Sequence, residues 1–172
     1  YLLTWHTYGT WLHGDDAGSV DVEHNRFSTP RLAADPMRFQ RELAALKHPP
    51  FVLLPLARTL VESVMREHCR IRAWQLLALA VRSNHVHVLI GVPSVEPEII
   101  VKQLKEWGTR RLRSHRIAGP QQRVWADHAS TEYLYEKGSV DSAMDYVLRM
   151  QDSVSQERSR PDWDKKLAIR EP

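Results

Sequence analysis

"SNHVHVLIGV", residues 83–92, combines β-branched apolar residues with two histidines that are one residue apart. Successive side chains of a β-strand point to opposite faces, so Val86, Val88 and Ile90 share one face and the two histidines share the other. The apolar face is typical of a strand that packs against a core. The stretch therefore predicts a strand with helices over one face and two imidazoles on the other.

The patterns on either side of this strand predict the remaining elements. In chain order we expect a strand over 1–6, helices over 37–47 and from about 55, strands over 74–81 and 85–92, a helix from about 96 to 116, a strand over 130–135 and a helix over 139–152. The polar stretch 8–36 is expected to be a loop, and Ser139 is the expected N-cap of the last helix, with Ser142 as its rival. This order favours an α+β fold, a ferredoxin-like antiparallel sheet with helices on one face plus a C-terminal helix.

The composition is that of one globular domain. Of the 172 residues, 42% are hydrophobic and 26% are charged. The single cysteine, Cys69, cannot form an internal disulfide, and neither a bilayer-spanning run nor a signal-peptide pattern is found, so we expect a cytoplasmic protein. The net charge of +3 is too small to predict a polyanionic partner by itself. We expect one domain over 1–152, followed by a polar tail over 153–172.

His85 and His87 are the first candidates for a functional site. Two imidazoles on one strand face can converge on one ion or one phosphate. The alternative is that one or both are merely polar side chains on an exposed face of the sheet. Two histidines alone identify neither a metal nor a reaction, so the residue pattern leaves both interpretations open.

Further segments of the chain match a known pattern. The segment His85-Val86-His87 resembles the His-hydrophobe-His motif of HUH nucleases. Tyr146, in "AMDYVLRMQ", lies on a helix after the last strand, and "LTWHTYGTWLHGD" and "RVWADHASTEYLY" look like segments of the same family. The chain, over roughly residues 1–152, resembles the single-tyrosine HUH transposases, which comprise the IS200-like transposases of the smallest insertion sequences and the REP-associated tyrosine transposases.

The resemblance implies roles for three of these residues. Tyr146 would be the catalytic nucleophile, and His85 and His87 would hold a divalent metal, Mg²⁺ or Mn²⁺, against the scissile phosphate. Mg²⁺ prefers oxygen ligands and imidazole suits softer ions, so Mn²⁺ is expected to be the better metal in vitro. Without the resemblance, a tyrosine on an amphipathic helix is more often a packing residue.

The third metal ligand departs from the family pattern. Relatives supply a glutamine one helical turn after the tyrosine, which is position 150, but this residue is Met150 and the glutamine is Gln151. In an α-helix, each residue turns by about 100°, so Gln151 would point away from Tyr146 unless the helix ends or bulges there. Gln151 remains the expected third ligand, with Asp152 or water as alternatives.

A basic segment is the candidate surface for DNA. Residues 102–123 contain seven basic residues and one acidic residue, Glu106. Beside the histidine motif this segment is interpreted as a surface that contacts phosphates, although a charged helix face is more often simply solvated. Trp11 is a candidate for stacking on unpaired bases, whereas Trp125 is expected to be a core or loop-anchoring residue. The candidate DNA-binding residues are Lys102, Lys105, Arg110, Arg111, Arg113 and Trp11.

The implied function is metal-dependent nicking and strand transfer of single-stranded DNA by a transposase. The reaction would pass through a 5′-phosphotyrosine at hairpin-bearing element ends. Two alternatives stay open: a domesticated nucleic-acid-binding protein that has lost cleavage, and a phosphodiesterase that uses the histidine pair on a substrate other than DNA. Family members often work as dimers, and the sequence leaves open whether this protein is a monomer or a homodimer.

Overall fold

The elements occur in the predicted order. The structure, a computed structural model, describes residues 1–15, 33–91 and 94–150. Its elements are β1 (Leu2–His6), α1 (Pro36–Ala44), α2 (Pro55–Ile71), β2 (Gln75–Val81), β3 (His85–Gly91), α3 (Pro97–Ser114), β4 (Ser130–Glu132), α4 (Lys137–Asp145) and the π-helical turn η1 (Tyr146–Met150). The predicted tail, 153–172, lies outside the described residues. Within those described ranges, no helix is long and apolar enough to cross a membrane.

The four strands form one antiparallel sheet in the order β2-β3-β1-β4. The central pair is β1 and β3, in which Leu3 lies opposite Val88 and His6 lies opposite His85. β4 is shorter than expected, three residues rather than six, and pairs only with β1. This strand order, with α2 before β2 and α3 before β4, is that of the predicted α+β, ferredoxin-like fold.

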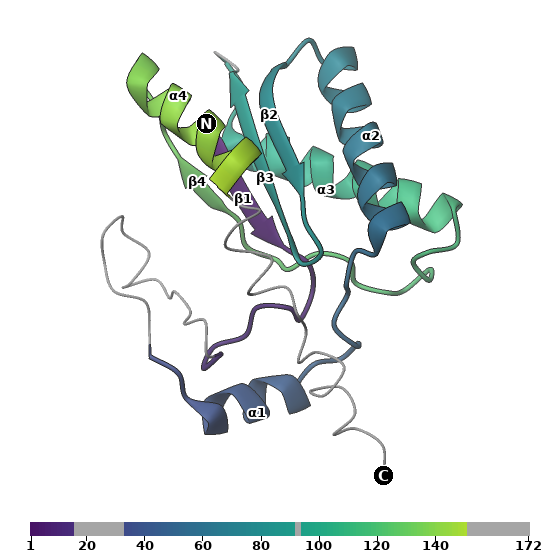
Figure 1. The fold of residues 1–172 in the computed structure, drawn as a ribbon. Helices are drawn as coiled ribbons and strands as arrows, with labels where there is room; N and C mark the ends of the chain where they lie inside the picture. Colours follow the sequence, from purple (N-terminus) through teal and green to yellow (C-terminus); the bar gives the residue numbers. More distant parts are fainter. Residues whose placement is uncertain (16–32, 92–93, 151–172) are drawn as a thin grey trace.

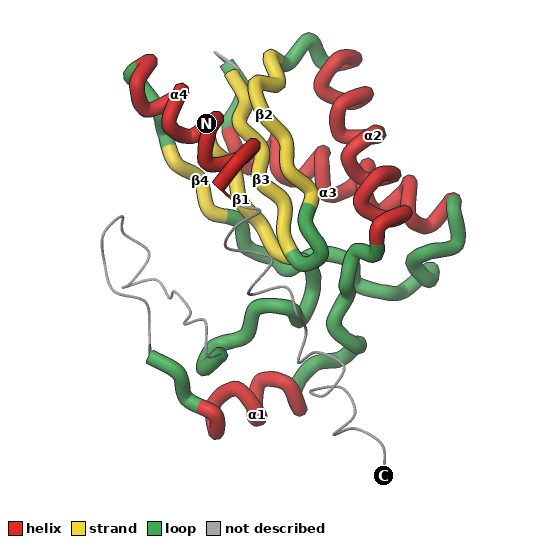
Figure 2. Tube along the Cα trace, viewed as in Figure 1, coloured by secondary structure: helices red, strands yellow, loops and turns green. Residues whose placement is uncertain are grey.

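Helices lie on both faces of the sheet (Figures 1 and 2). α2 and α3 cover the face from which Val86, Val88 and Ile90 project, and all three side chains are fully buried in this core, as predicted. Burying a side chain of this size contributes roughly 1.5–3 kcal/mol. Cys69 of α2 lies in the same core, and burial raises the pKa of its thiol to about 11. We call this side of the sheet the helix face.

The opposite side, which we call the site face, has a smaller apolar cluster. Ala143 of α4 and Val147 of η1 pack there against Ala78 and Ala80 of β2 and Leu89 of β3. The histidines project from β3 on this same side, because they alternate with the core valines. The C-terminal helix therefore covers the part of the sheet that lies beside the histidine pair.

The start of the last helix differs from the prediction. α4 begins at Lys137, and neither Ser139 nor Ser142 is its N-cap. The backbone N–H of Val140 already donates to the carbonyl of Glu136, so both serines lie inside the helix. The prediction relied on the serine preference at N-caps, but here the cap residue, Glu136, makes no side-chain cap hydrogen bond.

Candidate active site

The two histidines of β3 lie side by side on the site face. The centroids of the His85 and His87 rings are 4.8 Å apart, and their planes are inclined by 77°. His87 is buried, with 6% of its surface exposed, and His85 is partly exposed. The predicted convergence of two imidazoles is therefore present, with one ring deeper than the other.

Hydrogen bonds at Nδ1 orient both rings. Asn84 Oδ1 lies 2.7 Å from His85 Nδ1, and Thr4 Oγ1 lies 2.7 Å from His87 Nδ1. An amide oxygen only accepts, so His85 Nδ1 donates, and in the neutral ring Nε2 then has the lone pair; neutral His87 has the same tautomer when its Nδ1 donates to the Thr4 hydroxyl. Metal-binding histidines have such a partner on their other ring nitrogen, so this pair suits a metal bound through Nε2.

The turn before β3 is fixed by a buried threonine pair. The Thr7 and Thr10 hydroxyl oxygens lie 2.9 Å apart, and both lie 3.2 Å from the backbone carbonyl oxygen of Asn84, so one hydroxyl can donate to this carbonyl while the other donates within the pair. The backbone N–H of Thr7 donates to the same carbonyl. Because Asn84 also contacts His85, the segment after β1 helps to set the position of the histidine pair.

Tyr146 comes close to the pair from η1. Its ring centroid is 5.6 Å from that of His87, and 42% of its surface is exposed. Its neighbour Val147 is fully buried against the site face and anchors the turn. The structure therefore brings Tyr146, His87 and His85 together, as the sequence predicted, with the tyrosine at the accessible edge.

The third predicted ligand, Gln151, lies outside the described residues. In an α-helix Gln151 would point away from Tyr146. However, η1 is a π-helical turn, in which each hydrogen bond spans five residues instead of four. The turn begins at Tyr146 itself, so the α-helical rotation does not apply from that residue onward. Among the described residues, no group of three His, Cys, Asp or Glu side chains is arranged to hold a metal ion.

Sequence reasoning did not single out His6, which also lies at this site. It is the last residue of β1 and is paired with His85, and the two ring centroids are 5.7 Å apart. In the described part of the chain, its ring also lies near that of Trp11, with the centroids 3.9 Å apart. A signal was present in the sequence, because "LLTWH" alternates Leu3 and Trp5 with more polar side chains and therefore predicts that His6 faces away from the core.

The predicted basic residues lie on α3 and so belong to the helix face. Arg111 pairs with Glu67 of α2 at 2.9 Å, and the guanidinium of Arg110 lies over the ring of Trp107. The structure does not bring this group together with the histidine pair, because the sheet separates them. Trp11, in contrast, lies beside His6, whose ring centroid is 5.7 Å from that of His85. The α3 residues of the predicted group are Lys102, Lys105, Arg110, Arg111 and Arg113.

Lys105 holds the loop that precedes β4. Its ammonium group donates to the carbonyls of Ala126, Asp127 and His128, at 2.8, 3.2 and 3.3 Å. Burial lowers the pKa of Lys105 to about 8, while the nearby Asp127 carboxylate opposes this shift. These contacts give the ammonium a structural role, and contact with DNA stays a prediction for this residue.

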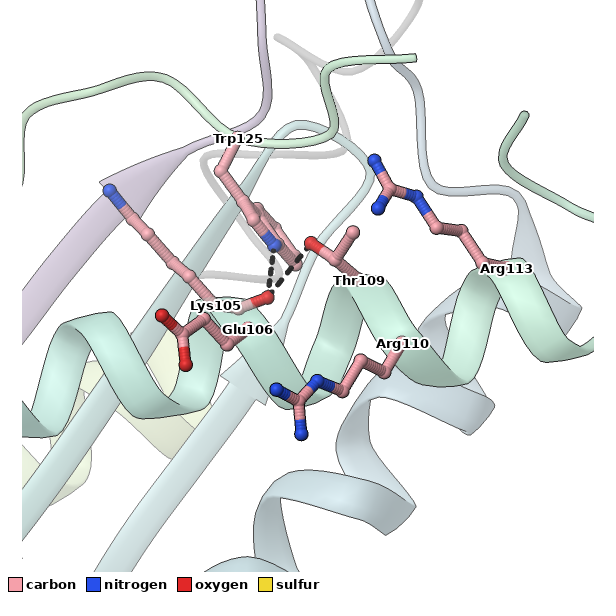
Figure 3. Close-up of a pocket in the computed structure, with 6 residues that line it drawn as sticks. All are labelled: Lys105, Glu106, Thr109, Arg110, Arg113 and Trp125. Atoms are coloured by element: carbon pink, nitrogen blue, oxygen red, sulfur yellow. Dashed lines mark hydrogen bonds between the residues drawn. The ribbon is translucent and has the colours of Figure 1, made fainter. Parts of the chain in front are cut away.

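A shallow pocket of about 300 Å³ lies between α3 and Trp125 (Figure 3). Trp125 is buried, as predicted, and its indole N–H donates to the backbone carbonyl of Lys105. Arg110 and Arg113 extend from α3 at the pocket, and Glu106 adds one carboxylate. The pocket is part of the basic surface of the helix face, across the sheet from the histidines.

The fold and site define an α+β domain with a histidine pair and a tyrosine on one face of its sheet. A profile of the family described as "Transposase IS200 like" matches residues 52–148, more than half of the chain, and the protein therefore belongs to this transposase family. The matched range contains both strand histidines and Tyr146, but neither β1 nor Trp11. Membership indicates a DNA-processing enzyme whose partner is DNA.

One solved structure is also similar. It is the crystal structure of a protein from Deinococcus radiodurans R1 that is described as a candidate transposase. The two chains are 16% identical, the match covers 90% of this chain and 87% of the other, and the TM-score is 0.48. Comparison with curated proteins finds no match.

Proposed function

We propose that this protein nicks and rejoins single-stranded DNA, with Tyr146 as the nucleophile. The observation that carries the proposal is the 5.6 Å separation between the rings of Tyr146 and His87 on the face that also holds His85. The packing of η1 does not account for this tyrosine, because Val147 provides the buried anchor and Tyr146 is 42% exposed. Membership of a transposase family supports DNA as the substrate.

The reaction needs no nucleotide cofactor, because each bond to phosphorus that breaks is replaced by a new one. The hydroxyl oxygen of Tyr146 attacks the phosphorus of the scissile phosphate while the bond to the 3′-oxygen breaks. The tyrosine proton passes to a base in the solvent, and the departing oxygen takes up a proton, so the products are a 5′-phosphotyrosine and a 3′-hydroxyl. Attack by another 3′-hydroxyl reverses the step and joins a new pair of strands.

His85 and His87 are the proposed ligands of a divalent metal, Mg²⁺ or Mn²⁺. When bound, the metal would withdraw charge from the phosphate and stabilise the negative charge of the transition state. The hydrogen bonds between each Nδ1 and its partner, Asn84 Oδ1 or Thr4 Oγ1, hold both rings with Nε2 directed away from these partners. Gln151 is the proposed third ligand, and water would complete the coordination.

The proposed DNA path uses both faces of the sheet. Single-stranded DNA would cross the site face at Tyr146, with Trp11 available for stacking on unpaired bases. The basic residues of α3 would bind phosphates farther along the DNA, in the hairpins of the element ends. Strand transfer must hold two DNA ends at once, and a homodimer is therefore part of the proposal.

The test is formation of a covalent adduct. The wild type, Tyr146→Phe and the control Tyr135→Phe are incubated with labelled single-stranded DNA from the flanks of the gene, with Mn²⁺ or with EDTA. Tyr135 is also exposed, but its only ring neighbour among the described residues is Tyr133. We expect a metal-dependent adduct on a denaturing gel for the wild type and the control, and none for Tyr146→Phe.

Two outcomes would contradict the proposal. An adduct that persists in Tyr146→Phe would show that another residue is the nucleophile. DNA that is bound by the wild type without any adduct, across all flanking sequences, would favour the domesticated DNA-binding protein over the transposase.

A further inference from the structure

We propose that His6 and Trp11 bind the nucleoside that carries the departing 3′-hydroxyl. The inference rests on the proposed function and adds to it which nucleotide these two side chains contact. Both residues lie outside the range that the family profile matches, and neither belongs to the histidine pair. Both lie across the histidine pair from Tyr146.

His6 extends the histidine pair onto the neighbouring strand. In the antiparallel register His6 lies opposite His85, and Thr4, on the same face, lies opposite His87. The ring centroids of His6 and His85 are 5.7 Å apart. The three imidazoles therefore lie next to one another on the directly paired strands β3 and β1.

Tyr146 approaches the pair from the other side. η1 packs over β2 and β3, where Val147 is buried against Ala78 and Ala80 of β2. Since His6 is on β1, the histidine pair on β3 lies between the tyrosine and His6. A phosphate held at the pair would therefore have Tyr146 on one side and His6 on the other.

The direction of the reaction places the leaving group on the side of His6. In phosphoryl transfer, the attacking and leaving oxygens lie roughly in line through the phosphorus. With Tyr146 attacking from the side of β2, the 3′-oxygen departs towards β1. The nucleoside attached to that oxygen must then lie near His6 and its neighbours.

Trp11 completes an aromatic surface at this position. Its ring centroid is 3.9 Å from that of His6, and the planes are inclined by 74°, so the two rings form nearly perpendicular walls. Trp11 is only partly buried, and aromatic rings stack on any base without sequence preference. The surface therefore suits an unpaired nucleobase of either type, purine or pyrimidine.

The segment that carries Trp11 is held in place by the body of the protein. Leu12, the next residue, packs against Phe39 and Leu43 of α1. Gly14 has a φ of +84°, and a Cβ at this position would collide with the carbonyl oxygen of Asp35. These contacts position Trp11 before DNA binds, as a preformed binding surface requires.

The test combines protein variants with abasic DNA. The wild-type adduct first identifies the scissile phosphate, and the base is then removed from the nucleotide on its 3′-hydroxyl side or on its 5′-phosphate side. We expect removal on the 3′-hydroxyl side to raise the DNA concentration for half-maximal adduct formation by about 10-fold, from the loss of one stacked base. Trp11→Leu should cause the same loss on intact DNA and no further loss on that abasic DNA.

Conservative and distant variants complete the experiment. Trp11→Phe and His6→Phe each keep an aromatic ring. In both variants the DNA concentration for half-maximal adduct formation should stay within about 3-fold of the wild-type value. Tyr135→Leu removes an exposed aromatic ring whose only ring neighbour among the described residues is Tyr133, and it should leave the reaction unchanged. If the losses from Trp11→Leu and from the abasic nucleotide multiply, or if Trp11→Leu couples instead to the base on the 5′-phosphate side, this inference is wrong while the proposed function stands. Absence of any wild-type adduct would overturn both.

Discussion

His68 and His87 are equally buried, each with 6% of its surface exposed, but they lie on opposite faces of the sheet. His68 lies between the rings of Trp74 and Trp107, and its Nε2 hydrogen-bonds the side-chain oxygen of Gln103 at 2.9 Å. His87 instead contacts a second histidine and a half-exposed tyrosine. Burial is therefore no guide to function here. The two residues are instead distinguished by their neighbours, which make His68 a packing residue and His87 a candidate ligand.

Removing each imidazole in turn gives the largest expected effect. His87→Ala should lower the rate of adduct formation by about 1000-fold, because it removes a proposed metal ligand and with it several kcal/mol of transition-state stabilisation. His68→Ala should lower the free energy of unfolding by about 1–3 kcal/mol, because Gln103 loses its partner, and should leave the adduct rate unchanged. Adduct kinetics and urea unfolding measure the two effects. If His87→Ala and His68→Ala lost adduct formation equally, the two histidines would not differ in function as proposed.

Shortening a core side chain on the helix face should affect stability alone. Leu104 of α3 is fully buried, and Leu104→Ala is expected to lower the free energy of unfolding by about 2–5 kcal/mol through lost burial and the cavity that remains. Leu148→Ala, at a half-exposed position on η1, should change the free energy by less than about 1 kcal/mol. Urea denaturation gives both values. A loss of adduct formation by folded Leu104→Ala would show that the helix face also shapes the site.

The hydrogen-bond partners of the imidazoles should affect the metal more than the fold. Thr4→Val keeps the side-chain shape but removes the hydroxyl that contacts His87 Nδ1. We expect Mn²⁺ to bind about 10- to 100-fold more weakly, as measured by calorimetry or electron paramagnetic resonance. Thr59→Val, on the exposed surface of α2, is the matched control. Unchanged Mn²⁺ affinity in Thr4→Val would contradict the assignment of Nε2 as the metal-binding atom.

The basic surface of the helix face should give a smaller, salt-dependent effect. Arg113→Ala removes one exposed guanidinium that we propose to bind phosphate, and it should reduce the slope of log affinity against log salt by about 1. Arg66→Ala is the control, because Arg66 lies on α2 and pairs with Glu62 at 2.7 Å. Fluorescence anisotropy with a DNA hairpin at several salt concentrations measures the slope. An unchanged slope in Arg113→Ala would mean that this part of the helix face is simply solvated.

The smallest expected effect concerns Lys105 and pH. Burial lowers its pKa from 10.5 to about 8, so between these values the unfolded chain binds more protons than the folded one. The free energy of unfolding should therefore rise with pH across this window, compared with that of Lys105→Met. The rise should be less than about 1 kcal/mol, because the three carbonyl hydrogen bonds favour the charged form of the ammonium group. Urea unfolding at pH 8 and 10 tests this, with exposed Lys102→Met as control. If the free energy of unfolding fell between these pH values instead, the pKa of Lys105 would be raised on folding, which contradicts the prediction.

The sheet and its core were predictable because they depend on local periodicity. Val86, Val88 and Ile90 alternate with the histidines, and this alternation by itself defined both faces of β3. The resemblance to single-tyrosine transposases added Tyr146, which the pattern alone would have assigned to packing. The position of Tyr146 beside His87 confirms that these residues meet, while their catalytic roles stay a proposal.

What could not be predicted depends on contacts between distant segments. His6 joins the site only through the pairing of β1 with β3, which no local pattern specifies. The side of the sheet on which α3 lies was predictable, because its apolar stripe had to cover the apolar face of β3, and the basic residues lie across the sheet from the histidines as a result. The π-helical turn at Tyr146–Met150 has no signal in side-chain spacing.

The pairing of β1 with β3 and β4 also has a consequence for protein synthesis. The Thr4 and His87 side chains that meet at the site are 83 residues apart in the chain, and β4 and η1 follow later still. Such non-local contacts form late and slowly compared with helices. While the chain is being translated, β1 therefore has no partner strand until β3 has left the ribosome, and the tyrosine arrives after both. A nascent chain of this design therefore has no assembled histidine–tyrosine site until its last elements have been synthesised.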